Sequence, residues 1–291
     1  MPGSRSMNSG PTHRTVASPL VAGLAAASLL LIAARGEAAD ATTMQATYVI
    51  TVGGVVVGHA QAETKFTDSG YVAEITGATS GLTRLATDAR ASLSGRGSIV
   101  GSQVVPSSYN LETVEEGLKT HVSMAMRAGA VTDLVAVPQL KRARDRVPVT
   151  PADIVGVVDP LSAFLIPLEG AGPASGQQVC DRTVKVFDGW TRFDIKLNYK
   201  ETKAVDGSSQ TYAGLVFVCS ARYIPVAGHR SKRETVRQMA DNDRLELWLV
   251  PVKDKPFVVP YRILLGTSIG DLVVYATRFS ATSPERHAEA E

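Results

Sequence analysis

Apolar and polar residues alternate along most of the chain from Ala46 onward, which is the period of a β-strand rather than of an α-helix. The first two runs, 46–52 and 55–66, are joined by Gly53-Gly54, because glycine enters the backbone of a two-residue hairpin turn without strain. Further runs bounded by turn residues predict strands near 71–78, 89–100, 107–113, 119–127, 179–187, 191–200, 211–223, 244–250, 260–265 and 271–279. Since most connections are too short for helical crossovers, the pattern predicts an antiparallel sheet of about 11–13 strands.

One segment departs from this period and predicts a short inserted helix near residues 159–166. Asp159 can cap this helix, Pro160 suits its first turn, and Pro167 limits it to about two turns. Its apolar residues fall close to one face: Leu161, Phe164, Leu165 and Leu168. A broad sheet has to curl or close, because its open edges are vulnerable. The expected fold is all-β with minor α, a strongly curved half-barrel or β-spiral with this helix on its concave side.

Residues 1–41 follow neither period. Basic residues precede an apolar run over 16–34 and small residues follow it, which is the arrangement of a secretory signal peptide. We expect cleavage near Ala41 or Ala38, and therefore a periplasmic protein with a single domain over 42–282 and a polar tail over 283–291. An uncleaved membrane anchor is the alternative, since an apolar run of this length can just span a bilayer.

The two cysteines, Cys180 and Cys219, both lie in runs that predict strands. In an oxidising compartment such a pair normally forms a disulfide, and no CxxC pattern or cluster of histidines points to redox or metal chemistry instead. In the chain-entropy model, closing a loop of about 40 residues stabilises a fold by about 4 kcal/mol. We therefore expect a structural disulfide between them.

Composition excludes several classes of protein. Hydrophobic residues make up 44% of the chain and charged residues 20%, as in ordinary globular domains, which argues against disordered and fibrous proteins. Lys and Arg total 30 against 28 Asp and Glu, a formal net charge of +2. This balance argues against nucleic acid as a partner.

A set of short segments carries a resemblance to a known family: Gly53–Gly58, Asp159–Ser162, Val186–Gly189, Tyr223–Pro225 with Gly228–Arg230, Leu247–Leu249 and Pro260–Ile263. In this order they resemble the exported proteobacterial family called domain of unknown function 3108, over nearly the whole mature chain. The resemblance implies a fold similar to the periplasmic lipoprotein carriers and receptors (LolA/LolB-like), a curved half-barrel around helices with an apolar cavity. It implies no catalytic residues. This chain departs from the carriers in its larger size and its cysteine pair.

Sequence patterns for catalysis and metal binding are missing. His59, His121, His229 and His287 are scattered, no HExxH or GxSxG pattern occurs, and the glycine pairs lack the other residues of a phosphate-binding loop. We therefore expect no metal, no cofactor and no enzymatic activity. A hydrolase of envelope polymers is the enzymatic alternative, and it needs a cleft with converging carboxylates or a Ser–His pair.

Two groups of residues are candidates for binding. The apolar group is either ordinary core or the lining of a cavity, and the many small residues of the chain favour a cavity because they fill a wide barrel poorly. Its members are Phe164, Leu165, Leu168, Trp248, Phe257, Tyr261 and Leu264. The basic group is either two solvated loops or a docking patch for anionic headgroups or an acidic partner. Its members are Lys141, Arg142, Arg144, Arg146, Arg230, Lys232 and Arg233.

The sequence favours a non-enzymatic periplasmic protein that binds an apolar ligand in cell-envelope maintenance. The ligand is a lipid, an acyl chain or a lipidated peptide, and its headgroup is expected near the basic residues. The alternative from another class is an interaction module with a filled core, which docks an envelope protein through a sheet edge.

Overall fold

The computed structural model describes residues 41–67, 69–81, 87–168, 174–207 and 211–282. Apart from Ala41, the expected signal peptide lies outside the described residues, and so does the expected C-terminal tail. All described residues belong to one compact unit, residues 38–291. No helix in the described part of the chain is long and apolar enough to cross a membrane.

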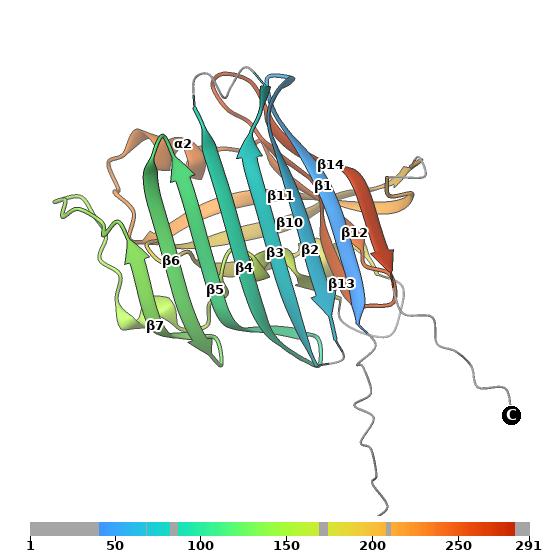
Figure 1. Cartoon of the computed structure of the whole chain (residues 1–291), viewed down its shortest axis with the longest axis horizontal. Helices are drawn as coiled ribbons and strands as arrows, with labels where there is room; N and C mark the ends of the chain where they lie inside the picture. Colours follow the sequence, from blue (N-terminus) through green and yellow to red (C-terminus); the bar gives the residue numbers. More distant parts are fainter. Residues whose placement is uncertain (1–40, 68, 82–86, 169–173, 208–210, 283–291) are drawn as a thin grey trace, which may run out of the picture. The chain divides into compact units, whose positions relative to one another are not determined.

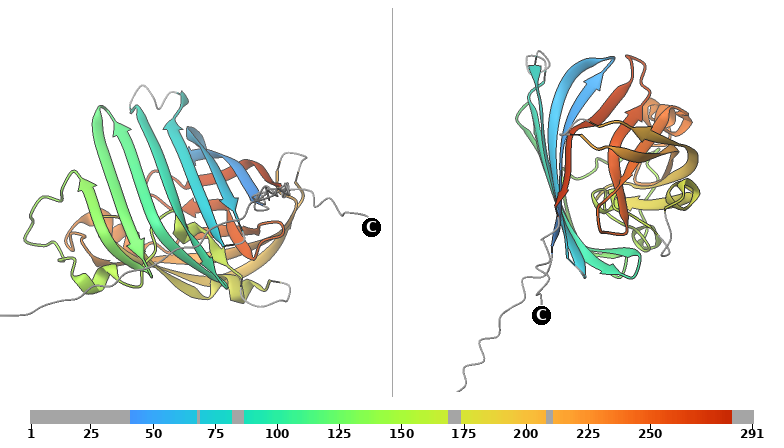
Figure 2. Two further views of the ribbon diagram at one scale, coloured as in Figure 1. Left: turned by 60° about the horizontal axis from the view of Figure 1, so that its bottom comes forward. Right: turned by 90° about the vertical axis from the view of Figure 1, so that its right-hand side faces the viewer.

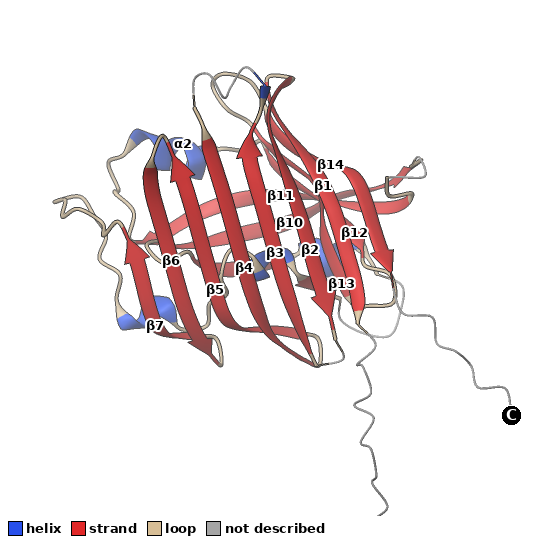
Figure 3. Ribbon diagram, viewed as in Figure 1, coloured by secondary structure: helices blue, strands red, loops and turns tan. Residues whose placement is uncertain are grey.

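The described residues form one antiparallel sheet of 14 strands with two short α-helices (Figure 1, Figure 3). The strands are β1 (Thr42–Val52), β2 (Val55–Phe66), β3 (Gly70–Thr79), β4 (Ala89–Val100), β5 (Gln103–Glu115), β6 (Leu118–Arg127), β7 (Ala130–Val137), β8 (Ile166–Pro167), β9 (Arg182–Phe187), β10 (Arg192–Val205), β11 (Gly214–Ala227), β12 (Leu245–Pro251), β13 (Phe257–Leu265) and β14 (Leu272–Thr282). The α-helices are α1 (Gly176–Cys180) and α2 (Glu234–Asp241), and two 3-10 helices are η2 (Pro151–Ile154) and η3 (Ser162–Phe164).

The two ends of the described chain meet in the middle of the sheet. The strand order is β7-β6-β5-β4-β3-β2-β1-β14-β13-β12-β11-β10-β9, with the two-residue β8 paired on β13. The sheet edges β7 and β9 therefore come from the middle of the sequence. A short connecting segment links them, because Val155 forms a bridge with Ala130 at the start of β7 and Val158 forms one with Val186 on β9. The strands and this segment together close the fold as the curved-sheet prediction requires.

The sheet turns back on itself, so that β9–β13 cover one face of β1–β6 (Figure 2). Phe66 of β2 and Phe257 of β13 stack across the two layers with ring centroids 5.4 Å apart. The first hydrophobic cluster lies between the layers and includes Met44, Phe66, Tyr71, Tyr109, Val122, Leu161, Leu165 and Phe257. Burial of these side chains supplies the main driving force for closing the sheet.

The hairpin between β1 and β2 confirms the prediction from Gly53-Gly54. β1 ends at Val52 and β2 begins at Val55, and the two glycines have positive φ angles of 55° and 85°. Such angles are readily accessible only to glycine, which is why the pattern of the sequence was sufficient here. The mostly β, antiparallel fold class is likewise confirmed.

Three expectations about local structure are wrong. The segment 159–166 contains the single 3-10 turn η3 instead of a two-turn helix, because Ile166 and Pro167 pair with β13. Residues 176–180 form α1 rather than the start of a strand, because Ser175 and Gln178 make a capping box. The strand count exceeds the predicted range because β7 and β8 were not recognised.

The disulfide between Cys180 and Cys219 joins α1 to β11, and the Cα atoms are 5.4 Å apart. Both residues are fully buried in a second hydrophobic cluster, formed by α1, β8 and β10–β13. It consists of Ile166, Val179, Cys180, Leu197, Phe217, Cys219, Ala221, Leu245, Leu247, Leu249 and Val258. The predicted pairing is confirmed, although Cys180 lies at the end of a helix and not in a strand. The bond holds α1 against the sheet.

Candidate functional site

A buried polar network positions the η3 segment between the two layers. Asp159 is fully buried, and its Oδ1 accepts hydrogen bonds from the backbone N–H groups of Leu161 and Ser162, both at 2.9 Å. The Ser162 hydroxyl donates to Asp159 Oδ2 at 2.5 Å and lies 2.5 Å from the hydroxyl of Tyr71 on β3. Gly95 on β4 faces the segment, where a Cβ would lie 3.3 Å from Leu161 Cδ2. These contacts tie the turn to the inner face of β3 and β4.

Burial controls the protonation of this network. It raises the pKa of the Asp159 carboxyl, although the hydrogen bonds from Ser162 and Leu161 act in the opposite direction. Burial also raises the pKa of the Tyr71 hydroxyl. Ser162 and Tyr71 are each only 2% exposed. The arrangement fixes the η3 turn and presents none of these side chains to solvent.

The first cavity lies between the η3 segment and strands β1–β3, β13 and β14, and has a volume of about 180 Å³. Part of its wall consists of the small side chains of Ala60, Ala62 and Ala73, which leave space that larger residues would fill. Tyr48 and Thr64 bring the two side-chain hydroxyls of the lining, and the Tyr48 hydroxyl already donates to the Pro260 carbonyl oxygen at 2.7 Å. None of the described residues that line the first cavity is charged.

The second cavity lies on the other side of η3 and has a volume of about 270 Å³. Larger apolar side chains from β9, β10, β12 and β13 form its walls, among them Val186, Phe193, Leu197, Leu247 and Leu265. Met239 of α2 also contributes to the lining. Again, no charged side chain occurs among the described residues that line it.

Phe164 and Ile263 line both cavities, so these two side chains lie between them. Phe164 is the last residue of η3 and is half-buried. Its place follows from the network at Asp159, which holds the turn that ends at Phe164. The two cavities are thus neighbours, and Phe164 and Ile263 form the partition between them.

The structure brings only two of the predicted apolar residues to the cavities. Phe164 lines both, and Leu165 lines the first. Leu168 packs against the second hydrophobic cluster. Phe257 is fully buried in the core, where its ring stacks on that of Phe66.

The other three predicted apolar residues line neither cavity. Trp248 forms cation–π contacts with Lys203 and Arg262, which lie 4.8 Å and 4.9 Å from its ring centroid. Its indole N–H donates to Glu246. Tyr261 contacts the ring of Tyr212, and Leu264 is paired with Glu246 across β12 and β13. Strand alternation explains this result, since Trp248 points to the opposite face from its neighbours Leu247 and Leu249.

Sequence reasoning missed the walls that the strands supply. Ala60, Ala62 and Ala73 were not singled out, nor were Phe193 and Met239. The signal for the alanines was available, because they occupy alternate, inward positions of β2 and β3 where larger apolar residues are usual. No comparable signal marked the residues around the second cavity, whose side chains are those of an ordinary core.

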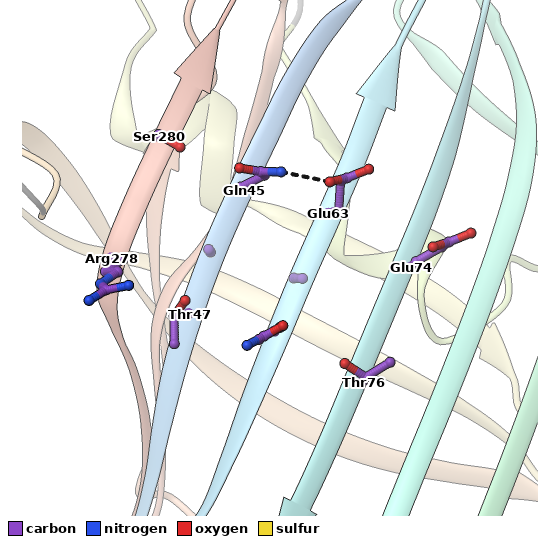
Figure 4. A pocket seen from close by; sticks show the side chains of 10 residues that line it. Gln45, Thr47, Glu63, Glu74, Thr76, Arg278 and Ser280 are labelled. Carbon is purple, nitrogen blue, oxygen red and sulfur yellow. Dashed lines mark hydrogen bonds between the residues drawn. The ribbon is translucent and has the colours of Figure 1, made fainter.

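A larger hollow of about 450 Å³ lies on the solvent side of β14 and β1–β3 and is polar (Figure 4). The strand register aligns Ser280, Gln45, Glu63 and Glu74 in one row. Gln45 Nε2 donates to Glu63 Oε2 at 2.7 Å, and this bond lowers the pKa of the Glu63 carboxyl. Along β1, Gln45 of this row lies between buried residues such as Met44, as expected where one face of an antiparallel sheet is exposed to solvent. The apolar cavities are therefore the better candidate for a binding site.

The predicted basic residues lie in two segments that the fold brings together. Lys141, Arg142, Arg144 and Arg146 follow β7, whereas Arg230, Lys232 and Arg233 follow β11. Arg146 and Arg230 form an antiparallel bridge between the segments. In the described part of the chain, no three His, Cys, Asp or Glu side chains come together as a metal site would require.

Comparison with known proteins agrees with this fold. No curated protein matches the chain. Among solved structures, a β-barrel-like protein of the domain of unknown function DUF1849 from Brucella abortus is similar, with a TM-score of 0.50 and 9% sequence identity. The match covers 83% of this chain and 98% of that one, and at this identity the likeness concerns the fold alone. The family model "Protein of unknown function (DUF3108)" matches residues 47–277, and the chain therefore belongs to the DUF3108 family.

Proposed function

We propose that this chain is a non-enzymatic periplasmic protein that binds a lipid, an acyl chain or a lipidated peptide and acts in cell-envelope maintenance, like the LolA/LolB-type carriers. The observation that carries the proposal is the pair of uncharged apolar cavities beside Phe164. An apolar ligand is favoured because each buried methylene contributes about 0.8 kcal/mol. A charged headgroup has no partner in either lining and has to remain outside.

Packing supports a ligand. Side chains that border unfilled space lack the contacts that a close-packed core supplies. The two cavities, of about 180 and 270 Å³, leave such space on either side of Phe164. An acyl chain in the cavities makes contacts with the lining that are otherwise missing.

The test combines ligand identification with a matched pair of variants. The exported protein is purified, its lipid extract is analysed by mass spectrometry, and the stripped protein is titrated with dansyl-labelled undecanoic acid. Ala73→Leu places a larger side chain in the first cavity, and we expect a loss of affinity of about tenfold, equivalent to about 1.4 kcal/mol. Ala125→Leu, the same change at an exposed position on β6, is expected to bind as the wild type does.

Two outcomes contradict the proposal. One is stripped protein that does not bind the dansyl probe and extracts that contain no lipid. The other is equal affinity in Ala73→Leu and Ala125→Leu, since the probe would then bind outside the first cavity.

The interaction module is the second candidate function. The edge strand β7 exposes Leu134, Val135 and Val137, at 40%, 48% and 49% of their surface, which is the kind of edge to which another strand adds. The function of such a module does not depend on the first cavity. Unchanged envelope function of Ala73→Leu in cells, together with loss of function in Val135→Lys, would favour it.

A further inference from the structure

Two basic segments far apart in the sequence are hydrogen-bonded to each other. Val147 N–H donates to the His229 carbonyl oxygen at 3.0 Å, and Gly228 N–H donates to the Val147 carbonyl oxygen at 2.8 Å. Ser231 N–H donates to the Asp145 carbonyl oxygen, also at 2.8 Å. The segments therefore form one short two-stranded unit. We call its basic residues the cationic platform: Lys141, Arg142, Arg144, Arg146, Arg230, Lys232 and Arg233.

Two of the seven cations hold the platform together. Arg146 Nη1 donates to the Gly228 carbonyl oxygen at 2.5 Å, and its Nε donates to the Lys141 carbonyl oxygen at 3.3 Å. Arg230 Nε donates to Asp145 Oδ1 at 3.0 Å. These bonds cross from one segment to the other or close a turn within one, so they serve the local structure.

The other five cations do not hold the platform together in this way. Lys141, Arg142, Arg144, Lys232 and Arg233 are all exposed, and within the described residues none of them forms an ion pair. Exposed cations gathered without counter-charges repel one another, and this repulsion costs stability unless an anion is supplied from outside.

The platform is also a concentration of charge in an otherwise balanced protein. Its seven cations and the two acidic residues of the same stretches, Asp145 and Glu234, give 7 − 2 = +5. The described residues as a whole contain 25 Lys and Arg and 21 Asp and Glu, which gives +4. Outside the platform the described protein thus carries −1, so the positive excess of the described residues lies in the platform.

The platform lies close to the second cavity. Arg233 immediately precedes α2, which Figure 1 shows behind the upper end of β6, and Met239 of α2 lines that cavity. Met239 is six positions beyond Arg233, which corresponds to a rise of about 9 Å along the helix. The platform therefore adjoins the helix that contributes Met239 to the lining of the second cavity.

We infer that the cationic platform docks this protein on an anionic phospholipid surface. The platform contains no aromatic residue that would insert between lipids, so the contact is electrostatic and reversible. Each cation near such a surface strengthens binding about fivefold at physiological ionic strength. Docking does not require an apolar ligand in the cavities, so it stands apart from the proposed function.

Sedimentation with vesicles tests the inference. The full exported protein is mixed with phosphatidylcholine vesicles, with or without one third phosphatidylglycerol. We expect binding only to the anionic vesicles, and release at high salt because the attraction is screened within about 10 Å at 0.1 M salt. The variant Arg142→Gln/Arg144→Gln/Lys232→Gln is expected to bind about 100-fold more weakly, about fivefold for each cation.

The control removes the same charge elsewhere. Lys119→Gln/Arg127→Gln/Lys253→Gln replaces three exposed cations outside the platform, and it is expected to keep wild-type affinity. Equal binding to both kinds of vesicle, no binding to either, or an equal loss in the two triple variants would overturn the inference. Thermal melts check that both variants fold. Ala73→Leu keeps the platform, so vesicle binding by that variant separates failure of docking from failure of ligand binding.

Discussion

The first cavity is bounded on β2 and β3 by alanines, whereas the second is bounded by large side chains such as Phe193, Leu197 and Leu247. Space in the first therefore exists because side chains are small. Space in the second exists although most of its lining side chains are large, so it depends on where the surrounding elements lie. A single substitution at an alanine can occupy part of the first cavity, but the second depends on the elements that support its walls.

Those supporting elements differ as well. The wall of the first cavity belongs to the long, regular strands β1–β3, paired with their neighbours along their whole length. The wall of the second includes β9, which has six residues, and one side chain of α2. Leu197, Leu245 and Leu247 belong both to this wall and to the cluster around the disulfide. The disulfide is thus part of the support of the second cavity and not of the first.

Removal of the disulfide is expected to have the largest effect. Cys180→Ser releases a loop closed over 39 residues, and the loss is about 4 kcal/mol in the chain-entropy model, or about 10 °C in melting temperature. Hydrogen exchange should accelerate on β10 and β11 and much less on β1–β3. The double variant Cys180→Ser/Cys219→Ser should match reduced wild-type protein. An unchanged melting temperature, with free thiols in the native protein, contradicts the pairing.

Truncation of Phe164, one of the two side chains of the partition, is expected to have the next largest effect. Phe164→Ala joins the two cavities, so that one chain can extend from the first into the second. Hexadecanoic acid should then gain up to about 3 kcal/mol over dodecanoic acid, about 0.8 kcal/mol for each of four methylenes. Competition against the dansyl probe measures both affinities. Phe164→Leu keeps most of the partition and is the control, and an unchanged chain-length preference in Phe164→Ala argues against adjoining cavities.

The smallest expected effect concerns Asp159, which anchors the partition. Burial raises its folded pKa above the unfolded value of about 3.9, so the folded protein holds a proton that the unfolded chain has already lost. The contribution of Asp159 to stability therefore falls as the pH rises from about 4 through the folded pKa. Asp159→Asn cannot ionise, and its free energy of unfolding should improve relative to wild type across this window in denaturant titrations.

Asp153→Asn is a control with the opposite sign. Hydrogen bonds from Thr150 lower the pKa of Asp153, so its contribution to stability is present above about pH 3.9 and is lost as the pH falls. This variant should therefore lose stability relative to wild type as the pH rises. A pH-independent difference for Asp159→Asn would show that burial does not raise the folded pKa of Asp159.

Local patterns predicted much of the fold. The glycine pair at 53–54 specified a hairpin, and the period of two located β1–β6 closely, because turn geometry and alternation depend on adjacent residues. Asp159 was recognised as a cap, and its carboxylate does accept backbone N–H groups. The length of the helix was wrong because pairing with β13 is a long-range contact that no local pattern contains.

The candidate site was predicted only in part. Phe164 and Leu165 stand in a segment whose period differs from its surroundings, and both line a cavity. Trp248 and Tyr261 are predicted from their strands to line the same interior, but they line neither cavity. The two basic runs were seen in the sequence as separate loops. Their union into one platform depends on backbone hydrogen bonds between residues 145–147 and 228–231, which join segments more than 80 positions apart.

The sequence by itself determined the antiparallel strands, the turn at the first hairpin, the cysteine pair and the segment that enters the fold at Asp159. All of these depend on backbone preferences and on the chemistry of single residues. Only the tertiary structure decided which strands face η3, how far apart the layers lie, and therefore that two cavities remain on either side of Phe164. The spacing of the layers results from the packing of all side chains together, so no single stretch of sequence specifies it.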